Sequence, residues 1–282
     1  MKLINPAYGL NISSVNCQIE IRCNDVIIFE YKGKNSAKKN GISLSMPINH
    51  VLLKNGDFDI RGTVLPIFDS ETLEDSSSLS LELYLMDYVA PKQTLVSLLK
   101  LTTPSKSELN NENTPSQPLK SLEGLPKYEI YSKFKAEALP FEEEGWLGSS
   151  DLSKLSYQSL LVKTYNFYRK IHTTISNKEV DLYNDITYER DKIIEKVYYY
   201  GPEKIKKEKQ EIKDLVQEPG LNLLPIKFDD LKLELMGNDK LVRLIRKNNL
   251  PVLMFYNPLN RKTVQLNFKL HKKTNSSELS II

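Results

Sequence analysis

The chain has 282 residues, of which 40% are hydrophobic and 27% are charged. This composition is typical of a globular protein and excludes the disordered class, and the length suits one large domain or two ordinary ones. The 39 basic and 36 acidic residues leave a formal net charge of only +3. The totals therefore do not predict a nucleic-acid partner, which requires a clustered excess of lysine and arginine.

The N-terminal stretch MKLINPAYGLNISS lacks the apolar run of a signal peptide, and no stretch of the chain approaches the roughly 20 apolar residues of a membrane span. We therefore expect a cytoplasmic protein with no membrane segment. Its only cysteines are Cys17 and Cys23. On one strand they share a face but lie about 20 Å apart, beyond disulfide reach. With no second Cys or His pair nearby to complete a zinc site, we interpret both as core residues.

The first hundred residues show strand periodicity. Residues 17–31 alternate apolar and polar side chains around an Asn24-Asp25 break, which predicts a hairpin. Residues 42–46 alternate again, and in 79–88 the leucines at 79, 81, 83 and 85 are predicted inside with Tyr84 outside. Short antiparallel strands without a convincing helix predict a β-sandwich domain over residues 1–101.

The stretch PINHVLLKNGDFDIRG, residues 47–62, places His50 near two aspartates and an Asn55-Gly56 turn. One hypothesis is the start of an active site. The other is a hairpin, in which Asp57 and Asp59 face solvent and His50 is a surface or cap residue. We favour the hairpin because His50 has no second titratable partner at motif spacing.

Composition changes at residues 102–118, TTPSKSELNNENTPSQP, which are rich in proline, serine and asparagine. We interpret residues 102–123 as a polar linker, with a long loop inside one domain as the alternative.

Helical periodicity follows over residues 161–175 and 182–200, and a narrow seam of Ile205, Ile212, Leu215 and Val216 predicts a third, solvated helix. Strand patterns return from residue 226, including one alternating run at 264–270. Residues 124–282 are therefore predicted to form an α+β domain, with helices packed on one face of an antiparallel sheet. The fold class is α+β with two domains.

No phosphate loop, dinucleotide fingerprint, HExxH or GxSxG motif is present. The three histidines, His50, His172 and His271, are dispersed. We read His172, on the first helix, as a boundary residue and not a catalytic base. The sequence predicts no catalytic, cofactor-binding or metal-binding residue.

Glu142, Glu143 and Glu144 precede Gly145 and Trp146, the only tryptophan. Adjacent carboxylates raise one another's pKa and suit acid–base chemistry, but consecutive side chains diverge in a helix or a strand. We therefore favour an exposed acidic loop, anchored by Trp146, that binds a basic partner.

Tyr198, Tyr199 and Tyr200 lie beside a lysine-rich stretch, as in proteins that bind single-stranded nucleic acid. Interleaved glutamates cancel most of that positive field. A tyrosine-rich surface that contacts a protein is therefore the favoured interpretation.

The segments EIRCNDVIIFEY and MPINHVLLKNGDFDIRGTVLPI, together with LPIKFDDLKLELMGNDKLVRLIRKNNLPVLMFYN and LNFKLHKKTNSSELSII, resemble uncharacterised bacterial proteins encoded beside secreted antibacterial toxins. The resemblance covers over half of the chain. It implies a non-enzymatic immunity protein that binds and occludes a cognate toxin, one delivered by a type VI-type secretion system. The expected contact residues are Glu142, Glu143, Glu144, Trp146, Tyr198, Tyr199 and Tyr200.

A second class of function stays open. Small β-sandwich modules often hold sugars, and Trp146 with Glu142 to Glu144 would supply a stacking platform and carboxylates. The alternative is therefore a carbohydrate-binding or carbohydrate-active protein.

Overall fold

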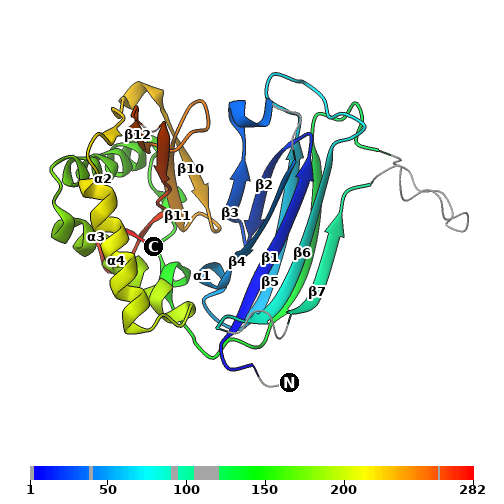
Figure 1. Ribbon diagram of the computed structural model, residues 1–282, viewed down its shortest axis with the longest axis horizontal. Helices are drawn as coiled ribbons and strands as arrows, with labels where there is room; N and C mark the ends of the chain where they lie inside the picture. Colours follow the sequence, from blue (N-terminus) through cyan, green and yellow to red (C-terminus); the bar gives the residue numbers. More distant parts are fainter. Residues whose placement is uncertain (1–2, 38–40, 90–94, 105–120, 260) are drawn as a thin grey trace, which may run out of the picture. The chain divides into compact units, whose positions relative to one another are not determined.

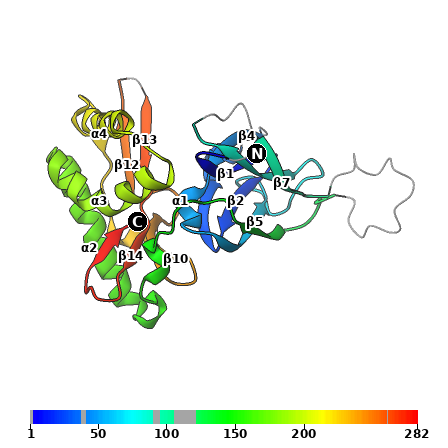
Figure 2. The same cartoon turned by 90° about the horizontal axis from the view of Figure 1, so that it is seen from below.

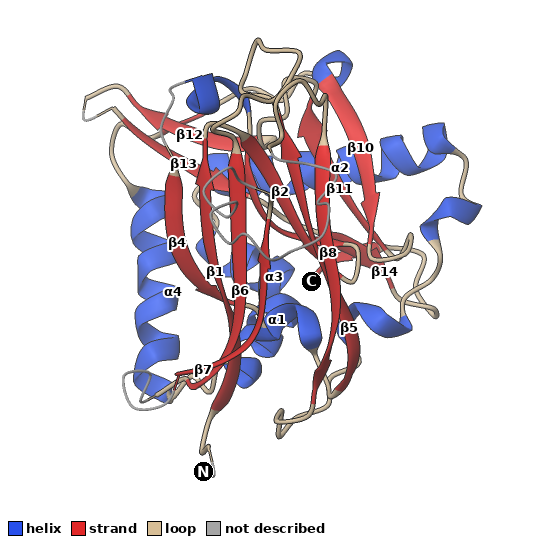
Figure 3. Cartoon of the chain, turned by 90° about the vertical axis from the view of Figure 1, so that its right-hand side faces the viewer, coloured by secondary structure: helices blue, strands red, loops and turns tan. Residues whose placement is uncertain are grey.

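The computed structural model of the chain describes residues 3–37, 41–89, 95–104, 121–259 and 261–282. The chain divides into two compact units, Met1–Glu142 and Glu143–Ile282. Helices and antiparallel sheets both contribute (Figure 3), which confirms a mixed, α+β type of fold. Across the described part of the chain, no helix is both long enough and apolar enough to cross a lipid bilayer.

The first unit contains two four-stranded antiparallel sheets (Figure 1). The first, in the order β4-β1-β6-β7, is formed by β1 (Pro6–Val15), β4 (Ile42–Pro47), β6 (Ser78–Asp87) and β7 (Leu95–Thr102). The second, in the order β3-β2-β5-β8, is formed by β2 (Gln18–Cys23), β3 (Val26–Tyr31), β5 (Gly56–Leu65) and β8 (Tyr128–Ala136).

Apolar side chains of the two sheets meet at a glycine. A Cβ atom at Gly62 of β5 would lie 2.7 Å from Leu79 and 3.0 Å from Leu81, both on β6. Those two leucines are each 1% exposed, as their alternation predicts. Glycine at position 62 therefore allows the close approach of the two sheets.

The predicted hairpin over residues 17–31 is confirmed, since β2 and β3 pair through a turn at Asn24 and Asp25. Both turn residues have positive φ, 47° and 64°, which is the geometry of a type I′ turn. Cys17 and Cys23 are free thiols buried in the core, as expected. Burial raises the pKa of Cys17 to about 11 and raises that of Cys23 further, so both remain protonated.

The hairpin expected around residues 47–62 is wrong. Residues before the turn form a single helical turn, α1 (Asn49–Leu52), and not a strand. The buried Asn49 side chain accepts a hydrogen bond from Tyr8 N at 2.9 Å and donates one to Pro6 O at 3.2 Å. The Asn55 side-chain amide donates a hydrogen bond to Leu139 O and accepts one from Leu139 N. These asparagines satisfy distant backbone groups, a use that short-range turn statistics do not reveal.

Tyr84 lies on the outer face of β6, as predicted, but it is buried there. Tyr84 lies opposite Gly9 of β1 in the sheet, and a Cβ atom at Gly9 would lie 2.3 Å from the tyrosine ring. The ring therefore covers the glycine, which leaves Tyr84 only 3% exposed.

The division between the units falls later in the chain than the predicted linker. The described strand β8 pairs with β5 along its length, from Gly56↔Ala136 to Val64↔Tyr128, so residues 128–136 lie in the first unit and not with the helices. The predicted domain 124–282 thus differs from the observed unit 143–282. Most of the predicted linker, residues 105–120, lies outside the described residues.

The second unit contains α2 (Tyr157–Ser176), α3 (Val180–Val197) and α4 (Pro202–Gln217), shown in Figure 2. The predicted apolar stripe of α2 is confirmed by the buried Leu161, Tyr168, Ile171 and Ile175. The Tyr168 hydroxyl donates to Phe268 O at 2.7 Å, which explains how a phenol is satisfied in the core. The seam of α4 is narrow as predicted, with only Val216 fully buried.

The predicted stripe of α3 is confirmed at the end of the helix, where Val197 is 0% exposed, but it is wrong at the start. Tyr183 and Thr187 are buried, at 1% and 0% exposure, whereas the predicted core residue Leu182 is 39% exposed. In the first half of the helix the contact face is one residue further along than predicted, and it includes a threonine. A prediction that counts only apolar residues does not include such a threonine and therefore places the contact face incorrectly.

Two antiparallel sheets, not one, complete this unit. The first, in the order β10-β11-β14-β15, is formed by β10 (Leu231–Met236), β11 (Leu241–Arg246), β14 (Leu270–Lys272) and β15 (Leu279–Ile281). The second, in the order β13-β12-β9, is formed by β9 (Asn222–Leu223), β12 (Leu253–Asn257) and β13 (Lys262–Leu266). The single run expected at 264–270 is therefore divided between the sheets. Helices α2 and α3 pack against the first sheet, through β11 and β15.

Candidate functional site

The acidic residues 142–144 have separate surroundings. Glu142, in the first unit, has an 80% exposed side chain 3.9 Å from Lys54. Glu143, in the second unit, forms an ion pair with Lys196 of α3. Glu144 is exposed, and its side chain lies across Gly148. The predicted acidic loop therefore holds one carboxylate already paired to α3 and two that are exposed to solvent.

Trp146 does not belong to an exposed surface. It is 4% exposed, and its ring lies against Gly237 between β10 and β11, where a Cβ atom would be 3.0 Å away. Its role is to anchor the 145–148 helical turn in the core. This burial corrects the assignment of Trp146 as a partner contact, and it removes the stacking platform on which the sugar-binding alternative depended.

The three tyrosines at the end of α3 also differ from one another. Tyr198 is 5% exposed and its ring centroid lies 6.2 Å from that of Tyr200, so Tyr198 is largely a packing residue. Tyr199 has a positive φ of 56° where the chain turns toward α4. Tyr200 is half-buried, and the Lys204 ammonium lies 5.3 Å from its ring centre. Of the three, Tyr200 is the one that lines a surface hollow.

An exposed aromatic residue that the sequence interpretation missed is Tyr188, in the middle of α3. It is 62% exposed, with the Lys192 ammonium 5.8 Å from its ring centre. Lys192 in turn forms an ion pair with Glu195 at 2.6 Å. Tyr188, Lys192 and Glu195 are spaced by four and three residues and so follow one side of the helix. We call these three residues the α3 ridge.

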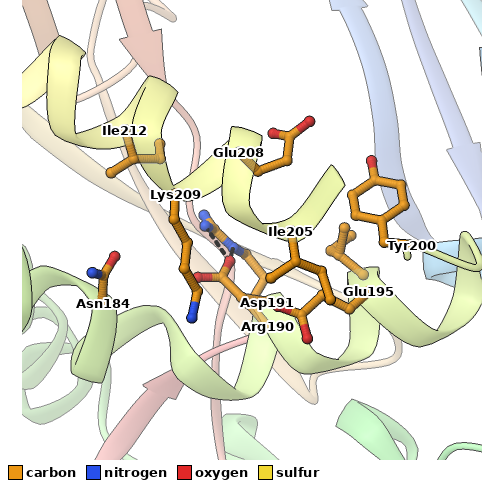
Figure 4. Close-up of a pocket in the computed structure, with 10 residues that line it drawn as sticks. Asn184, Arg190, Asp191, Glu195, Tyr200, Ile205, Glu208, Lys209 and Ile212 are labelled. Carbon is orange, nitrogen blue, oxygen red and sulfur yellow. Dashed lines mark hydrogen bonds and ion pairs between the residues drawn. The ribbon is translucent and has the colours of Figure 1, made fainter. Parts of the chain in front are cut away.

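Two hollows border the α3 ridge. The groove between α3 and α4 has a volume of about 310 Å³, and Figure 4 shows side chains from both helices directed into it. The second hollow, of about 580 Å³, lies between α3 and the segments around residues 143–149 and 273–275. Glu143 and Glu144 line the second hollow and Tyr200 lines the groove. The structure thus brings predicted residues to both sides of α3.

A buried polar network lies under the second hollow. The Ser149 hydroxyl is 2.6 Å from His271 Nδ1, and His271 Nε2 is 3.3 Å from a Glu189 carboxylate oxygen. Lys273 forms an ion pair with the other oxygen of Glu189, at 2.8 Å. His271 is 0% exposed, and burial lowers its pKa despite the opposing effect of Glu189, so the ring is neutral.

Serine, histidine and glutamate are the residue types of a hydrolase triad, but the arrangement differs from one. The serine contacts Nδ1, the nitrogen that normally faces the carboxylate. The Ser149 and Ser150 N–H groups, which an oxyanion site would use, already donate to Trp146 O and Lys272 O. We therefore interpret the network as a structural joint between α3, β14 and the 145–150 segment.

The other histidines occupy ordinary surroundings. His172 Nε2 lies 3.2 Å from Leu224 O, and burial lowers the pKa of its ring. His50 is half-buried on α1. Within the described ranges, no group of three or more histidine, cysteine or acidic side chains is arranged to hold a metal ion.

Comparison with known proteins adds no assignment. No family model, no curated protein and no solved structure matches this chain. The α3 ridge and the hollows beside it are therefore the features of the molecule that bear on its function.

Proposed function

We propose that the protein is an immunity protein that binds a cognate antibacterial toxin and neutralises it by occlusion, without catalysis. The observation that carries the proposal is the α3 ridge, where Tyr188 is 62% exposed and lines the second hollow, while Glu195 lines the groove between α3 and α4. Exposed aromatic residues beside pockets are the usual anchors of protein interfaces. The toxin would be one delivered by a type VI-type system, and the encounter would take place in the cytoplasm.

The ridge is held ready for binding by its own contacts. The Lys192 ammonium lies over the Tyr188 ring and forms an ion pair with Glu195. The side chains of Tyr188 and Lys192 therefore lose little further conformational entropy when a partner binds. The proposed surface keeps Glu143, Glu144 and Tyr200 from the sequence prediction, because they line the hollows. It omits Trp146 and Tyr198, which are buried. In domain terms, we infer a β-sandwich unit that accompanies the toxin-binding α+β unit.

The test is protection of growth. The toxin encoded beside this chain is produced in the cytoplasm of a sensitive strain, with or without the chain. We expect the chain to restore growth and Tyr188→Ala to lose most of that protection.

A matched control separates binding from general damage. Tyr157, the first residue of α2, is 60% exposed and lies away from the ridge in sequence and on another helix. Tyr157→Ala should protect as well as the unaltered chain. Absence of protection by the unaltered, folded chain would reject the proposal.

A further inference from the structure

The groove between α3 and α4 combines an apolar floor with polar side chains at its edge. Ile194 of α3 and Ile205 and Ile212 of α4 supply the apolar part, and each is half-buried. Figure 4 shows Asn184 and Lys209 at one end and Tyr200 at the other. The volume of about 310 Å³ suits one or two side chains of a partner.

Most charges around the groove are already compensated. Arg190 binds Asp191 through two contacts, at 2.6 and 2.9 Å, and Asp191 also accepts from Thr187 at 2.6 Å. Glu195 is paired with Lys192, and Glu208 with Lys204. These pairs contribute little net field to the groove.

Lys209 is different. Among the residues that the structure describes, neither its ammonium group nor the Asn184 side-chain amide has a hydrogen-bond or ion-pair partner, and both line the same end of the groove. Since Arg190 is neutralised by Asp191, this end carries one uncompensated positive charge. An ammonium and an amide N–H beside an apolar floor are the donors that a carboxylate with an apolar body requires.

We propose that this groove receives an acidic side chain adjacent to an apolar side chain of the protein partner. The carboxylate lies between Lys209 and Asn184, and the apolar group packs on Ile194, Ile205 and Ile212. That the partner is the toxin rests on the function proposed above. The chemistry of the groove can be tested without the toxin.

The probes are phenylacetate and phenethylammonium, which share an apolar ring and carry opposite charges. Each is titrated into the full chain labelled at the isoleucine δ1 methyl groups and followed by NMR. We expect phenylacetate to shift the methyl signals of Ile194, Ile205 and Ile212. Its dissociation constant should be about tenfold below that of phenethylammonium, the preference expected from one charge-assisted hydrogen bond.

Charge-reversed variants give the sharper comparison. Lys209→Glu should abolish or reverse the preference. Lys207, on the opposite side of the same helix, is 69% exposed at its side chain, so Lys207→Glu serves as the control and should keep the preference. If Lys209→Glu does not fold, Lys209→Met also removes the positive charge and tests the same preference for phenylacetate. The comparison of the two probes on the unaltered chain needs no variant.

Three results would overturn the inference: no methyl shift with either probe, equal or tighter binding of phenethylammonium, or a preference that survives Lys209→Glu. Failure of the toxin proposal is distinguishable from these. A chain that gives no protection but prefers phenylacetate in the groove would retain the inferred chemistry and lose the toxin as its partner.

Discussion

Burial of His271 makes one side chain a source of pH dependence. Its ring faces Ser149, Glu189 and, through Glu189, Lys273. The neutral form fits this network, because Nδ1 accepts from Ser149 and Nε2–H faces the carboxylate. Protonation would remove the Nδ1 acceptor and place a second cation next to Lys273.

We therefore expect stability to fall with acid. The folded-state pKa of His271 lies below its ordinary 6.5, so the unfolded chain binds more protons below that pH. The contribution is complete above pH 6.5 and is lost as the pH falls through the folded pKa. In urea unfolding between pH 7.5 and 5.5, the free energy of unfolding should fall as the pH falls, with a contribution from this group that stays below the roughly 1.4 kcal/mol per pH unit of one whole proton.

The control is His271→Gln, which should flatten the pH dependence more than His172→Gln, since His172 is only half-buried. An unchanged slope in His271→Gln would mean that the acid sensitivity has another source.

A substitution at Gly237 tests how closely Trp146 is packed. An added methyl group would lie 3.0 Å from the indole, so Gly237→Ala should cost about 1–3 kcal/mol through overpacking and through its φ of 62°. Gly220→Ala, with φ 76° but only the exposed Leu259 side chain at 3.3 Å, shares the backbone strain without the rigid neighbour. Equal losses of unfolding free energy in the two variants would contradict this account.

At the scale of elements, helix α3 shows where prediction from sequence succeeds and where it fails. Its existence follows from the 3.6-residue period, as does the burial of Val197, but the first half of its contact face does not, because it includes the polar residue Thr187, which is buried and donates a hydrogen bond to Asp191. Strands β2 and β6 were predictable from their alternation of apolar and polar residues, and β3 from the apolar run that follows the Asn24-Asp25 break. The α1 turn was not, because the hydrogen bonds of Asn49 and Asn55 reach residues far along the chain. The exposure of Tyr188 was difficult to predict from the sequence, because the only indication was its position next to the contact face of the helix.

The observed face of α3 leads to a direct comparison of neighbouring residues. Tyr183→Ala removes a fully buried ring and should cost about 3–5 kcal/mol of unfolding free energy. Leu182→Ala, at a site 39% exposed, should cost about 0.5 kcal/mol or less. Chemical denaturation measures both. The reverse order would restore the face predicted from the sequence.

At the scale of the whole molecule, the limits of the two units depend on β8. Local composition pointed to a linker at 102–123, but the pairing of β5 with β8 spans that segment and cannot be read from it. The fragment 1–142 should therefore fold cooperatively, whereas 1–123 should be less stable because β5 loses its partner strand. Circular dichroism and thermal unfolding of the two fragments measure this, and equal stability would favour the earlier boundary.

The most direct test of the proposed toxin binding is the dissociation constant of the purified complex, measured by calorimetry with the proposed cognate toxin. We expect tight binding by the unaltered chain, a loss of about 2 kcal/mol or more of binding free energy for Tyr188→Ala, and no significant loss for Tyr157→Ala. Equal affinities for all three proteins would remove the α3 ridge from the interface. Absence of binding by the unaltered chain would contradict the proposed function itself.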